Sequence, residues 1–238
     1  MPTRGVLHVR WGPRPNPNLD GEYKRCLDSI RQHHPDMPVH TAEVDAKPGD
    51  GFSPKSAIYE LSPFDETVYL DADTVVMGNL DFAFEQAARH GMALCVCECP
   101  WARRYVYAVP PCDMVEYNAG VVFFSKRPDV EAVMKEYHRL AYRVDTRVPY
   151  IAANGAPAKS VPQDQCALAM AISKLNFNPF VLPQNWNFRP RWQRVVFGPV
   201  KIWHEHDAPP PMVVEATRAT QAPAPPAKWE MVVREVPR

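Results

Sequence analysis

The sequence predicts an α/β domain in which helices flank a mostly parallel sheet. Short apolar runs of strand length alternate along the chain with segments of helical periodicity, and this alternation is typical of layered α/β folds. The run AGVVFFS at 119–125 is continuously hydrophobic, which indicates a strand buried on both faces. Because ligands bind at the carboxyl ends of the strands in such sheets, functional residues are expected at that edge.

The individual elements follow from hydrophobic periodicity and from the positions of glycine and proline. Strands are expected at 5–10, 38–44, 67–77, 92–98 and 119–125, with strand-like pieces at 180–182 and 195–204. Helices are expected at 22–34, 52–61, 80–90 and 164–175 and after Pro128, and a loop is expected at 148–163. The helix after Pro128 has an apolar stripe with a period of about 3.6 residues, and proline is well tolerated at a helix start.

The 238 residues predict one large domain over 1–207 and a proline-rich tail over 208–238. Seven of the 27 prolines lie in the tail, at 209, 210, 211, 223, 225, 226 and 237. Such a composition is typical of an extended segment. No internal repeat is evident along the chain.

The composition excludes several classes of protein. Hydrophobic residues make up 46% of the chain and charged residues 23%, which is typical of a folded globular protein. The formal net charge is zero, so no overall positive field favours nucleic acid or an anionic membrane. No apolar stretch approaches the ~18 residues of a membrane span, and 1–12 lacks the apolar core of a signal peptide. A cytoplasmic protein without a transmembrane segment is therefore expected.

Three of the six cysteines, Cys95, Cys97 and Cys99, alternate within an apolar run. Side chains at i and i+2 of a strand share one face, so buried thiols are the simplest interpretation. A zinc site is disfavoured because the paired C-x-x-C spacing of structural zinc sites is absent.

Two carboxylates, Asp71 and Asp73, interrupt the apolar run TVYLDADTVVMGN at 67–79. In an extended chain, side chains at i and i+2 point the same way, so both could bind one divalent cation, which prefers oxygen ligands. Burying two anions without a positive partner would be costly. The alternative interpretation is a turn or cap at the end of a strand, which is a common use of aspartate.

Phosphatases of the haloacid dehalogenase type use a comparable pair, in which the first aspartate is the nucleophile and the second is the acid and base. Under this alternative, Asp71 would form the covalent bond and Asp73 would transfer the proton. Such enzymes also require a strand near the N-terminus and an acidic pair downstream. The motif instead begins about seventy residues into the chain, and no Asp-Asp pair follows it.

The sequence resembles glycosyltransferase family 8, the group of glycogenin and the lipopolysaccharide galactosyltransferases, across about residues 52–206. Five segments match in order: 53–85 (SPKSAIYELSPFDETVYLDADTVVMGNLDFAFE), 117–128 (YNAGVVFFSKRP), 162–172 (PQDQCALAMAI), 182–188 (LPQNWNF) and 200–206 (VKIWHEH). The resemblance implies a nucleotide-diphospho-sugar transferase of the GT-A fold, with a mostly parallel mixed sheet flanked by helices. It also implies transfer of a hexose from a nucleotide diphosphate sugar, a UDP-sugar, to a saccharide, lipid-linked glycan or protein acceptor.

The resemblance implies a metal site formed by Asp71, Asp73 and His204, with His206 as the rival histidine ligand. The ion would bridge the diphosphate of the donor. Two carboxylates, one imidazole and two phosphate oxygens nearly complete an octahedron, and the imidazole favours Mn²⁺ over Mg²⁺. A hydrogen-bonded histidine at the end of a strand is the structural alternative for His204.

The resemblance places further donor-binding residues at His8, Lys55, Ala72, Asn118, Ala119 and Gly120. Lys55 would contact the nucleotide or its diphosphate, and an ordinary exposed lysine is the alternative. Asn118 would hydrogen-bond hydroxyl groups of the donor sugar, and Gly120 would let the backbone approach closely. His8 would line the nucleoside pocket, and a histidine of the core is its alternative.

Asp164 and Gln165 match the Asp-Gln pair that the family has at its reaction centre, so the resemblance implies that both are catalytic. Family members retain the anomeric configuration, either by front-face substitution or through a contested covalent intermediate, and retention is therefore implied here. Asp164 also begins a predicted helix, where an aspartate is an ordinary N-cap. The metal would offset the negative charge that develops on the departing nucleotide diphosphate.

The chain departs from the family at His204, where HEHDAPPP stands in place of a Gly and a Lys-Pro-Trp segment whose lysine contacts the diphosphate. This departure leaves open a non-catalytic protein that binds a sugar nucleotide. Trp186, Trp192 and Arg189 could form an acceptor platform, because aromatic faces stack on sugars, although tryptophan more often packs in the core. Acceptor selectivity is expected in the loop at 148–163 and in the tail.

Overall fold

The computed structural model describes residues 2–12, 16–97, 114–145, 147, 149–151, 154–159, 161–193 and 198–221. The main sheet has six strands in the order β2-β1-β3-β6-β5-β9. These are β1 (Arg4–Arg10), β2 (Val39–Glu43), β3 (Glu66–Leu70), β5 (Met92–Val96), β6 (Tyr117–Ser125) and β9 (Phe180–Leu182). β6 runs antiparallel to both of its neighbours, and the other three pairings are parallel. The predicted α/β class with a mostly parallel mixed sheet is therefore confirmed.

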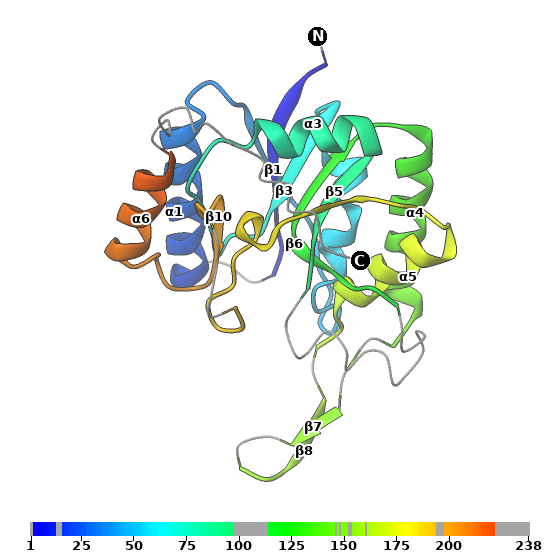
Figure 1. Ribbon diagram of the computed structural model, residues 1–238. Coiled ribbons are helices and arrows are strands. Elements are labelled where there is room, and N and C mark those ends of the chain that lie inside the picture. The colour runs from blue at the N-terminus through cyan, green and yellow to red at the C-terminus, as the bar shows by residue number, and fades with distance from the viewer. Residues whose placement is uncertain are drawn as a thin grey trace, which may run out of the picture.

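Helices cover both faces of this sheet (Figure 1). They are α1 (Pro17–His33), α2 (Ile58–Leu61) with the 3₁₀ turn η1 (Ser53–Ala57) before it, α3 (Asp81–His90), α4 (Pro128–Arg143) and α5 (Asp164–Lys174). Adjacent strand residues point to opposite faces, so Val6 packs in the hydrophobic cluster with α1 and α3, whereas Leu7 packs in the cluster with α4 and α5. β6 is buried along its whole length, as its continuous apolar run predicts.

The prediction of a single strand over 67–77 is wrong at residues 71–73. β3 ends at Leu70, residues 71–73 form a turn, and β4 (Thr74–Val76) belongs to a second sheet, where it pairs antiparallel with β10 (Ile202–His204). The turn is closed by Thr74, whose backbone N–H and hydroxyl both donate to the carbonyl oxygen of Asp71. Both flanking strands are buried, which is why their residues form one continuous apolar pattern. The two aspartates therefore occupy a turn, the alternative that their residue type suggested.

Two segments that were expected to be irregular have regular structure. α1 starts at Pro17 instead of residue 22, because Asn16 caps the helix by accepting a hydrogen bond from the backbone N–H of Leu19. The loop expected at 148–163 contains a hairpin of β7 (Pro149–Ile151) and β8 (Pro157–Lys159). This hairpin extends away from the body of the molecule (Figure 1).

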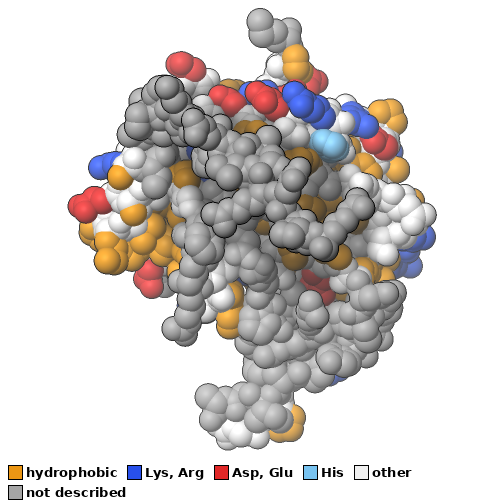
Figure 2. Space-filling view, viewed as in Figure 1, with side chains coloured by type: hydrophobic (Ala, Val, Ile, Leu, Met, Phe, Trp, Pro, Cys, Tyr) orange, Lys and Arg blue, Asp and Glu red, His pale blue; other side chains and the backbone are white. Residues whose placement is uncertain are grey.

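A further helix, α6 (Pro211–Gln221), occupies part of the segment expected to be an extended tail. Its Val213 and Val214 pack against the small cluster that includes Val75 and Trp203, so apolar burial outweighs the proline-rich composition here. In Figure 2, hydrophobic side chains gather where α6 lies, and Met212 is 73% exposed. Within the part of the chain that the structure describes, no helix is both long enough and apolar enough to cross a membrane.

Several sequence predictions fall outside the described residues. These are the end of the strand at 98, Cys99, the first part of the strand-like piece at 195–204, and the tail from 222 onward. The division into a domain over 1–207 and a tail remains a prediction. Of the other two cysteines in the alternating run, Cys95 is buried and donates its thiol to the carbonyl oxygen of Pro183, whereas Cys97 is half-buried.

Candidate active site

Among the described residues, a cavity lies at the carboxyl ends of β1 and β3, which form the lower edge of the sheet in Figure 1. Its volume is about 740 Å³, which suits a small-molecule ligand. Because β6 is antiparallel, its first residues and not its last reach this edge. Every metal, donor-binding and catalytic residue that the sequence predicts lines this cavity except His8.

Three lining side chains converge on one point. The ligand atoms of Asp71, Asp73 and His204 all lie within 4.8 Å of one another. The Nε2 atom of His204 is 3.4 Å from Asp73 Oδ1 and 3.9 Å from Asp71 Oδ2. The Nδ1 atom of the rival ligand His206 also lies 3.9 Å from Asp73 Oδ2, but this side chain is exposed, pairs with the Glu22 carboxylate at 3.0 Å and is not in the group of ligand atoms within 4.8 Å of one another. The geometry therefore selects His204 for the cluster.

The two sheets meet at this cluster. The antiparallel pairing of β4 and β10 places His204 beside the turn, and the backbone N–H of Glu205 donates to the carbonyl oxygen of Asp73 at 3.0 Å. On the other side, the backbone N–H of Asp71 donates to the carbonyl oxygen of Gly120 at 2.8 Å. The turn is thus fixed to β6 at one end and to β10 at the other.

Gly120 has no side chain, and the side chains of the cluster occupy the space that one would fill. A Cβ atom on this residue would lie 2.4 Å from His204 Cε1 and 2.5 Å from Asp71 Oδ2, far inside van der Waals contact. Any side chain here would displace two of the three ligand groups. The glycine is therefore required by the geometry of the cluster itself.

The Asp73 carboxylate is stabilised in its ionised form by a protonated His204. Burial acts to raise the pKa of Asp73, but the positive charge and hydrogen bond of a protonated His204 ring outweigh burial, so the pKa lies well below its usual range. The side chains of Asp71 and Asp73 are 23% and 19% exposed, so both can be reached from the cavity.

Lys55 joins the cluster to the predicted reaction centre. Its side chain is buried, and its Nζ lies 3.3 Å from Asp71 Oδ2 and 3.4 Å from Asp164 Oδ1. Burial acts to lower the pKa of Lys55, but the two carboxylates more than offset this, and the pKa lies above its usual value. The exposed-lysine alternative is therefore wrong, and Lys55 is a protonated bridge between two aspartates.

Asp164 is not the N-cap of its helix. That position belongs to Gln163, which makes no side-chain capping bond, and Asp164 is the first helical residue. Its side chain is buried and accepts a hydrogen bond from the Tyr137 hydroxyl at 2.6 Å on Oδ2, while Oδ1 faces Lys55. Burial raises the pKa of Asp164, and the contacts with Lys55 and Tyr137 offset this only in part.

The Gln165 side chain lies between two polar side chains of the β6 segment. Its Nε2 donates to Glu116 Oε2 at 3.1 Å, and its Oε1 lies 3.5 Å from Asn118 Nδ2. Glu116 was not predicted from the sequence, although a charged residue directly before a buried strand is a usable signal. It is 5% exposed, its Oε1 atom has no hydrogen-bond partner among the residues that the structure describes, and burial raises its pKa to about 7.

His8 lies behind the cavity and does not line it. Its side chain is 2% exposed, and burial lowers its pKa to about 4, so the ring is neutral. Nδ1 lies 2.9 Å from the carbonyl oxygen of Leu70, which can only accept, so Nδ1 carries the proton. The core-histidine alternative describes His8, because the burial of β1 takes this side chain away from the pocket.

The expected acceptor platform is only partly present. Trp186 is buried and packs against Phe123 in the core, so it is not available to an acceptor. Arg189, Arg191 and Trp192 do line the cavity. Within the described part of the chain, the Nε atom of Arg189 is buried without a hydrogen-bond partner, and Arg191 lies 3.3 Å from the Glu205 carboxylate. The guanidinium groups of Arg189 and Arg191 therefore lie near the segment after His204, where this chain lacks the Lys-Pro-Trp segment of the family.

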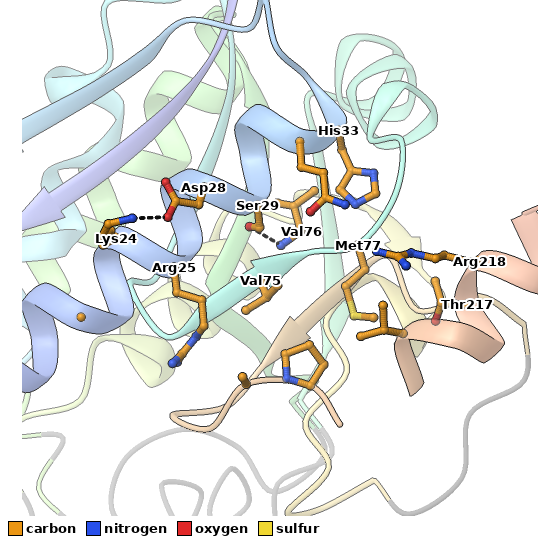
Figure 3. A pocket seen from close by; sticks show the side chains of 15 residues that line it. Lys24, Arg25, Asp28, Ser29, His33, Val75, Val76, Met77, Thr217 and Arg218 are labelled. Atoms are coloured by element: carbon orange, nitrogen blue, oxygen red, sulfur yellow. Dashed lines mark hydrogen bonds and ion pairs between the residues drawn. The ribbon is translucent and has the colours of Figure 1, made fainter. Parts of the chain in front are cut away.

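A second cavity, of about 470 Å³, lies between α1, β4 and α6 (Figure 3). Within it Lys24 is paired with Asp28, and the Ser29 hydroxyl oxygen accepts a hydrogen bond from the Val76 backbone (Figure 3). Arg25 lines this second cavity, and its guanidinium donates to the carbonyl oxygen of His206, which lines the first cavity. The predicted site residues all lie outside this cavity.

We expect that Gly120→Ala abolishes cation binding at the cluster, because the added Cβ displaces His204 and Asp71. Thermal unfolding with and without Mn²⁺ measures this: the metal should raise the Tm of the wild type and leave that of Gly120→Ala unchanged. The control is Gly21→Ala in α1, where a Cβ would meet nothing within 4 Å. An equal metal-induced rise in Gly120→Ala would contradict the geometry described above.

The buried Glu116 predicts a pH-dependent stability. Its pKa is raised from 4.5 in the unfolded chain to about 7, so the folded state holds more protons between these values. The contribution of Glu116 to the free energy of unfolding should therefore fall as the pH rises through this window, by at most about 3 kcal/mol. Buried His8, whose pKa is lowered, acts in the opposite direction in every variant. Urea unfolding at pH 4.5 and pH 8 should therefore show the loss as a difference between the wild type and Glu116→Gln. The same slope in Glu116→Gln and in the surface variant Glu85→Gln would refute the assignment.

The described chain resembles solved glycosyltransferases. No protein-family model and no curated protein sequence matches it. The galactosyltransferase LgtC, solved with donor and acceptor sugar analogues, has a TM-score of 0.54 at 12% identity, over 84% of this chain and 86% of that one. Mouse xyloside xylosyltransferase 1 has a TM-score of 0.54 at 13% identity, over 84% and 96% of the two chains. A glycosyltransferase that acts in glycosylation of the PBCV-1 major capsid has a TM-score of 0.55 at 14% identity, over 85% and 93%. The chain therefore has the GT-A fold of these glycosyltransferases.

Proposed function

We propose that this protein is a metal-dependent glycosyltransferase that moves a hexose from a UDP-sugar to a saccharide, lipid-linked glycan or protein acceptor, with retention of the anomeric configuration. The proposal rests on one observation: a single cavity of a GT-A fold is lined both by the possible cation ligands and by the residues expected at the reaction centre. These are Asp71, Asp73, His204, Asp164 and Gln165. Cation ligands and the residues expected at the reaction centre thereby share a single ligand-sized space.

The cluster has the chemistry and the spacing of a divalent cation site. Metal–ligand bonds of about 2.1 Å allow two ligands of one ion to lie at most about 4.2 Å apart. The distances from His204 Nε2 to the nearest oxygens of Asp73 and Asp71, 3.4 Å and 3.9 Å, satisfy this limit, and the third pair, the Asp71 and Asp73 carboxylates, lies within 4.8 Å, so a small movement of these two side chains would complete the ligand set. Because one of the ligands is an imidazole, Mn²⁺ is favoured over Mg²⁺.

The two oxygens of Asp71 share the Lys55 ammonium but differ in their other partners. Oδ1 accepts a hydrogen bond from the Tyr69 hydroxyl at 2.5 Å, whereas Oδ2, 3.3 Å from Lys55 Nζ, also faces His204 and is the oxygen directed at the cation site. When bound, the cation would offset the negative charge that develops on the departing UDP. Arg189 and Arg191 supply further positive charge in the same cavity and take the place of the missing family lysine.

Asp164 acts as a positioning residue in this proposal. Both of its oxygens are engaged, one with the Tyr137 hydroxyl and the other with Lys55, and its side chain is 3% exposed. A carboxylate held in this way is poorly placed to attack a sugar carbon. Gln165 lines the same cavity and is only half-buried, so its amide is more accessible from the cavity than the Asp164 carboxylate. The arrangement thus favours front-face substitution, which needs no protein nucleophile.

The phosphatase alternative fits the site less well. A covalent mechanism requires Asp71 to present a free oxygen as the nucleophile. Both oxygens of Asp71 lie within 3.4 Å of the Lys55 ammonium, and one also accepts the Tyr69 hydroxyl hydrogen bond. The structure supports Asp71 as a charge-paired ligand better than as a nucleophile.

We expect the purified protein to release UDP from a UDP-hexose in the presence of Mn²⁺. Asp73→Asn removes one anionic ligand and should lower the rate by a factor of at least about 100, because metal stabilisation of the leaving group contributes several kcal/mol. The surface variant Asp36→Asn is the matched control. A coupled assay for UDP, run on a panel of UDP-hexoses with and without EDTA, measures the rate.

Two outcomes would overturn the proposal. Tight binding of UDP-hexose and Mn²⁺ without any turnover would favour a protein that only binds sugar nucleotides. Hydrolysis of a phosphomonoester that disappears in Asp71→Asn would favour the phosphatase alternative.

A further inference from the structure

A chain of hydrogen bonds leads from the backbone of β6 to the histidine of the cluster. It starts at Gly120, whose backbone N–H donates to Asn118 Oδ1 at 2.9 Å. A backbone N–H can only donate, so the Asn118 atom facing it must be the amide oxygen. The orientation of the Asn118 amide is therefore fixed by the main chain of the sheet.

The second bond fixes the orientation of Asn187. One atom of its amide lies 2.8 Å from the same Asn118 oxygen, and because that oxygen only accepts, the atom must be the Nδ2 donor. The Asn187 oxygen is consequently turned the other way. It lies 2.7 Å from Nδ1 of His204.

The third bond fixes the tautomer of His204. An amide oxygen only accepts, so His204 Nδ1 must carry a proton. In the neutral ring the lone pair is then on Nε2. This is the atom that faces Asp73 at 3.4 Å and Asp71 at 3.9 Å.

Burial makes these bonds difficult to replace by water. Asn118, Asn187 and His204 are 5%, 2% and 4% exposed. A buried polar group that loses its partner costs about 1–3 kcal/mol. Backbone bonds on both sides of Phe188 hold this segment beside β10: the Phe188 N–H donates to the Ile202 carbonyl, and the His204 N–H donates to the Phe188 carbonyl.

We propose that Asn187 is the positioning residue of the cluster: held by Asn118, it fixes the tautomer and ring orientation of His204 so that Nε2 faces the cation site. As far as the cation is concerned, the inference rests on the proposed function. The tautomer itself follows from the protein atoms alone. Outer partners of this kind commonly control metal affinity through the ligand they orient.

The tautomer is tested directly on the wild-type protein. ¹⁵N NMR of histidine side chains at pH 8, with the His204 signals assigned by their loss in His204→Gln, reports which ring nitrogen carries a proton. We expect a protonated Nδ1 in the metal-free protein and in the presence of Mg²⁺. An unprotonated Nδ1 in either state would overturn the inference, whatever the catalytic activity.

The effect on the cation is tested by calorimetric titration of Mn²⁺ into the protein. Asn187→Ala removes both bonds of the Asn187 amide and should weaken Mn²⁺ binding by a factor of about 10–100. The control is Asn185→Ala in the same segment, which removes a bond to the Pro199 carbonyl and leaves His204 untouched. Asn185→Ala should bind Mn²⁺ as the wild type does, and circular dichroism verifies that both variants are folded.

These results separate the two claims. If the wild type binds Mn²⁺ and a folded Asn187→Ala binds it equally well, the role of Asn187 is refuted while the proposed function stands. If the wild type binds no Mn²⁺ and releases no UDP, the proposed function fails, and the NMR measurement still decides the tautomer of His204. If Asn187→Ala does not fold, the NMR measurement on the wild type again decides.

Discussion

The accumulation of negative charge at one edge of the sheet is the constraint on which the site depends. Asp71, Asp73 and Asp164 line one cavity, and Lys55 lies between the first and the third. One ammonium group does not neutralise three carboxylates, and uncompensated anions in a partly buried space are costly. Under the proposed function, a divalent cation beside His204, together with the guanidinium groups of Arg189 and Arg191, would offset the remaining charge, which would tie the stability of this edge to ligand binding.

The fold brings these groups together by interrupting a strand. β3 and β4 follow one another in the sequence but belong to different sheets, and the turn between them carries both aspartates. β10 then brings His204 alongside, while β6 contributes a glycine where no side chain fits. A rigid buried strand on one side and a short two-stranded sheet on the other leave the turn little freedom, which suits a site that must hold its ligands in place.

The sequence was most informative where one residue type carries the signal. Two aspartates within a buried apolar run indicated the cation site, and the strand at 119–125 was recognisable from its unbroken hydrophobic pattern. The turn at 71–73 appeared only as an alternative, because the strands on both sides of it are buried and form one apolar pattern, and the partner strand β10 is distant in the sequence. The resemblance implied roles for His204, Asp164 and Gln165, but only the structure shows that all three line one cavity.

Other features depend on contacts that no local pattern encodes. Glu116 and Gln165 are 49 residues apart in the sequence, and Asn187 and Asn118 are 69 residues apart, so their hydrogen bonds exist only in the folded chain. His8 differs in the opposite way: it was expected to line the nucleoside pocket, but its side chain is buried in the core. In α6, apolar packing outweighed a proline-rich composition that favoured an extended segment.

The central claim is that one cation is held jointly by Asp71, Asp73 and His204. Anomalous diffraction at the manganese edge, from a crystal grown with Mn²⁺ and UDP, tests it most directly. The account predicts a single strong peak within about 2.2 Å of an Asp71 oxygen, an Asp73 oxygen and His204 Nε2. A peak bound by other side chains, or UDP seated in the cavity with no peak beside these three residues, would contradict it.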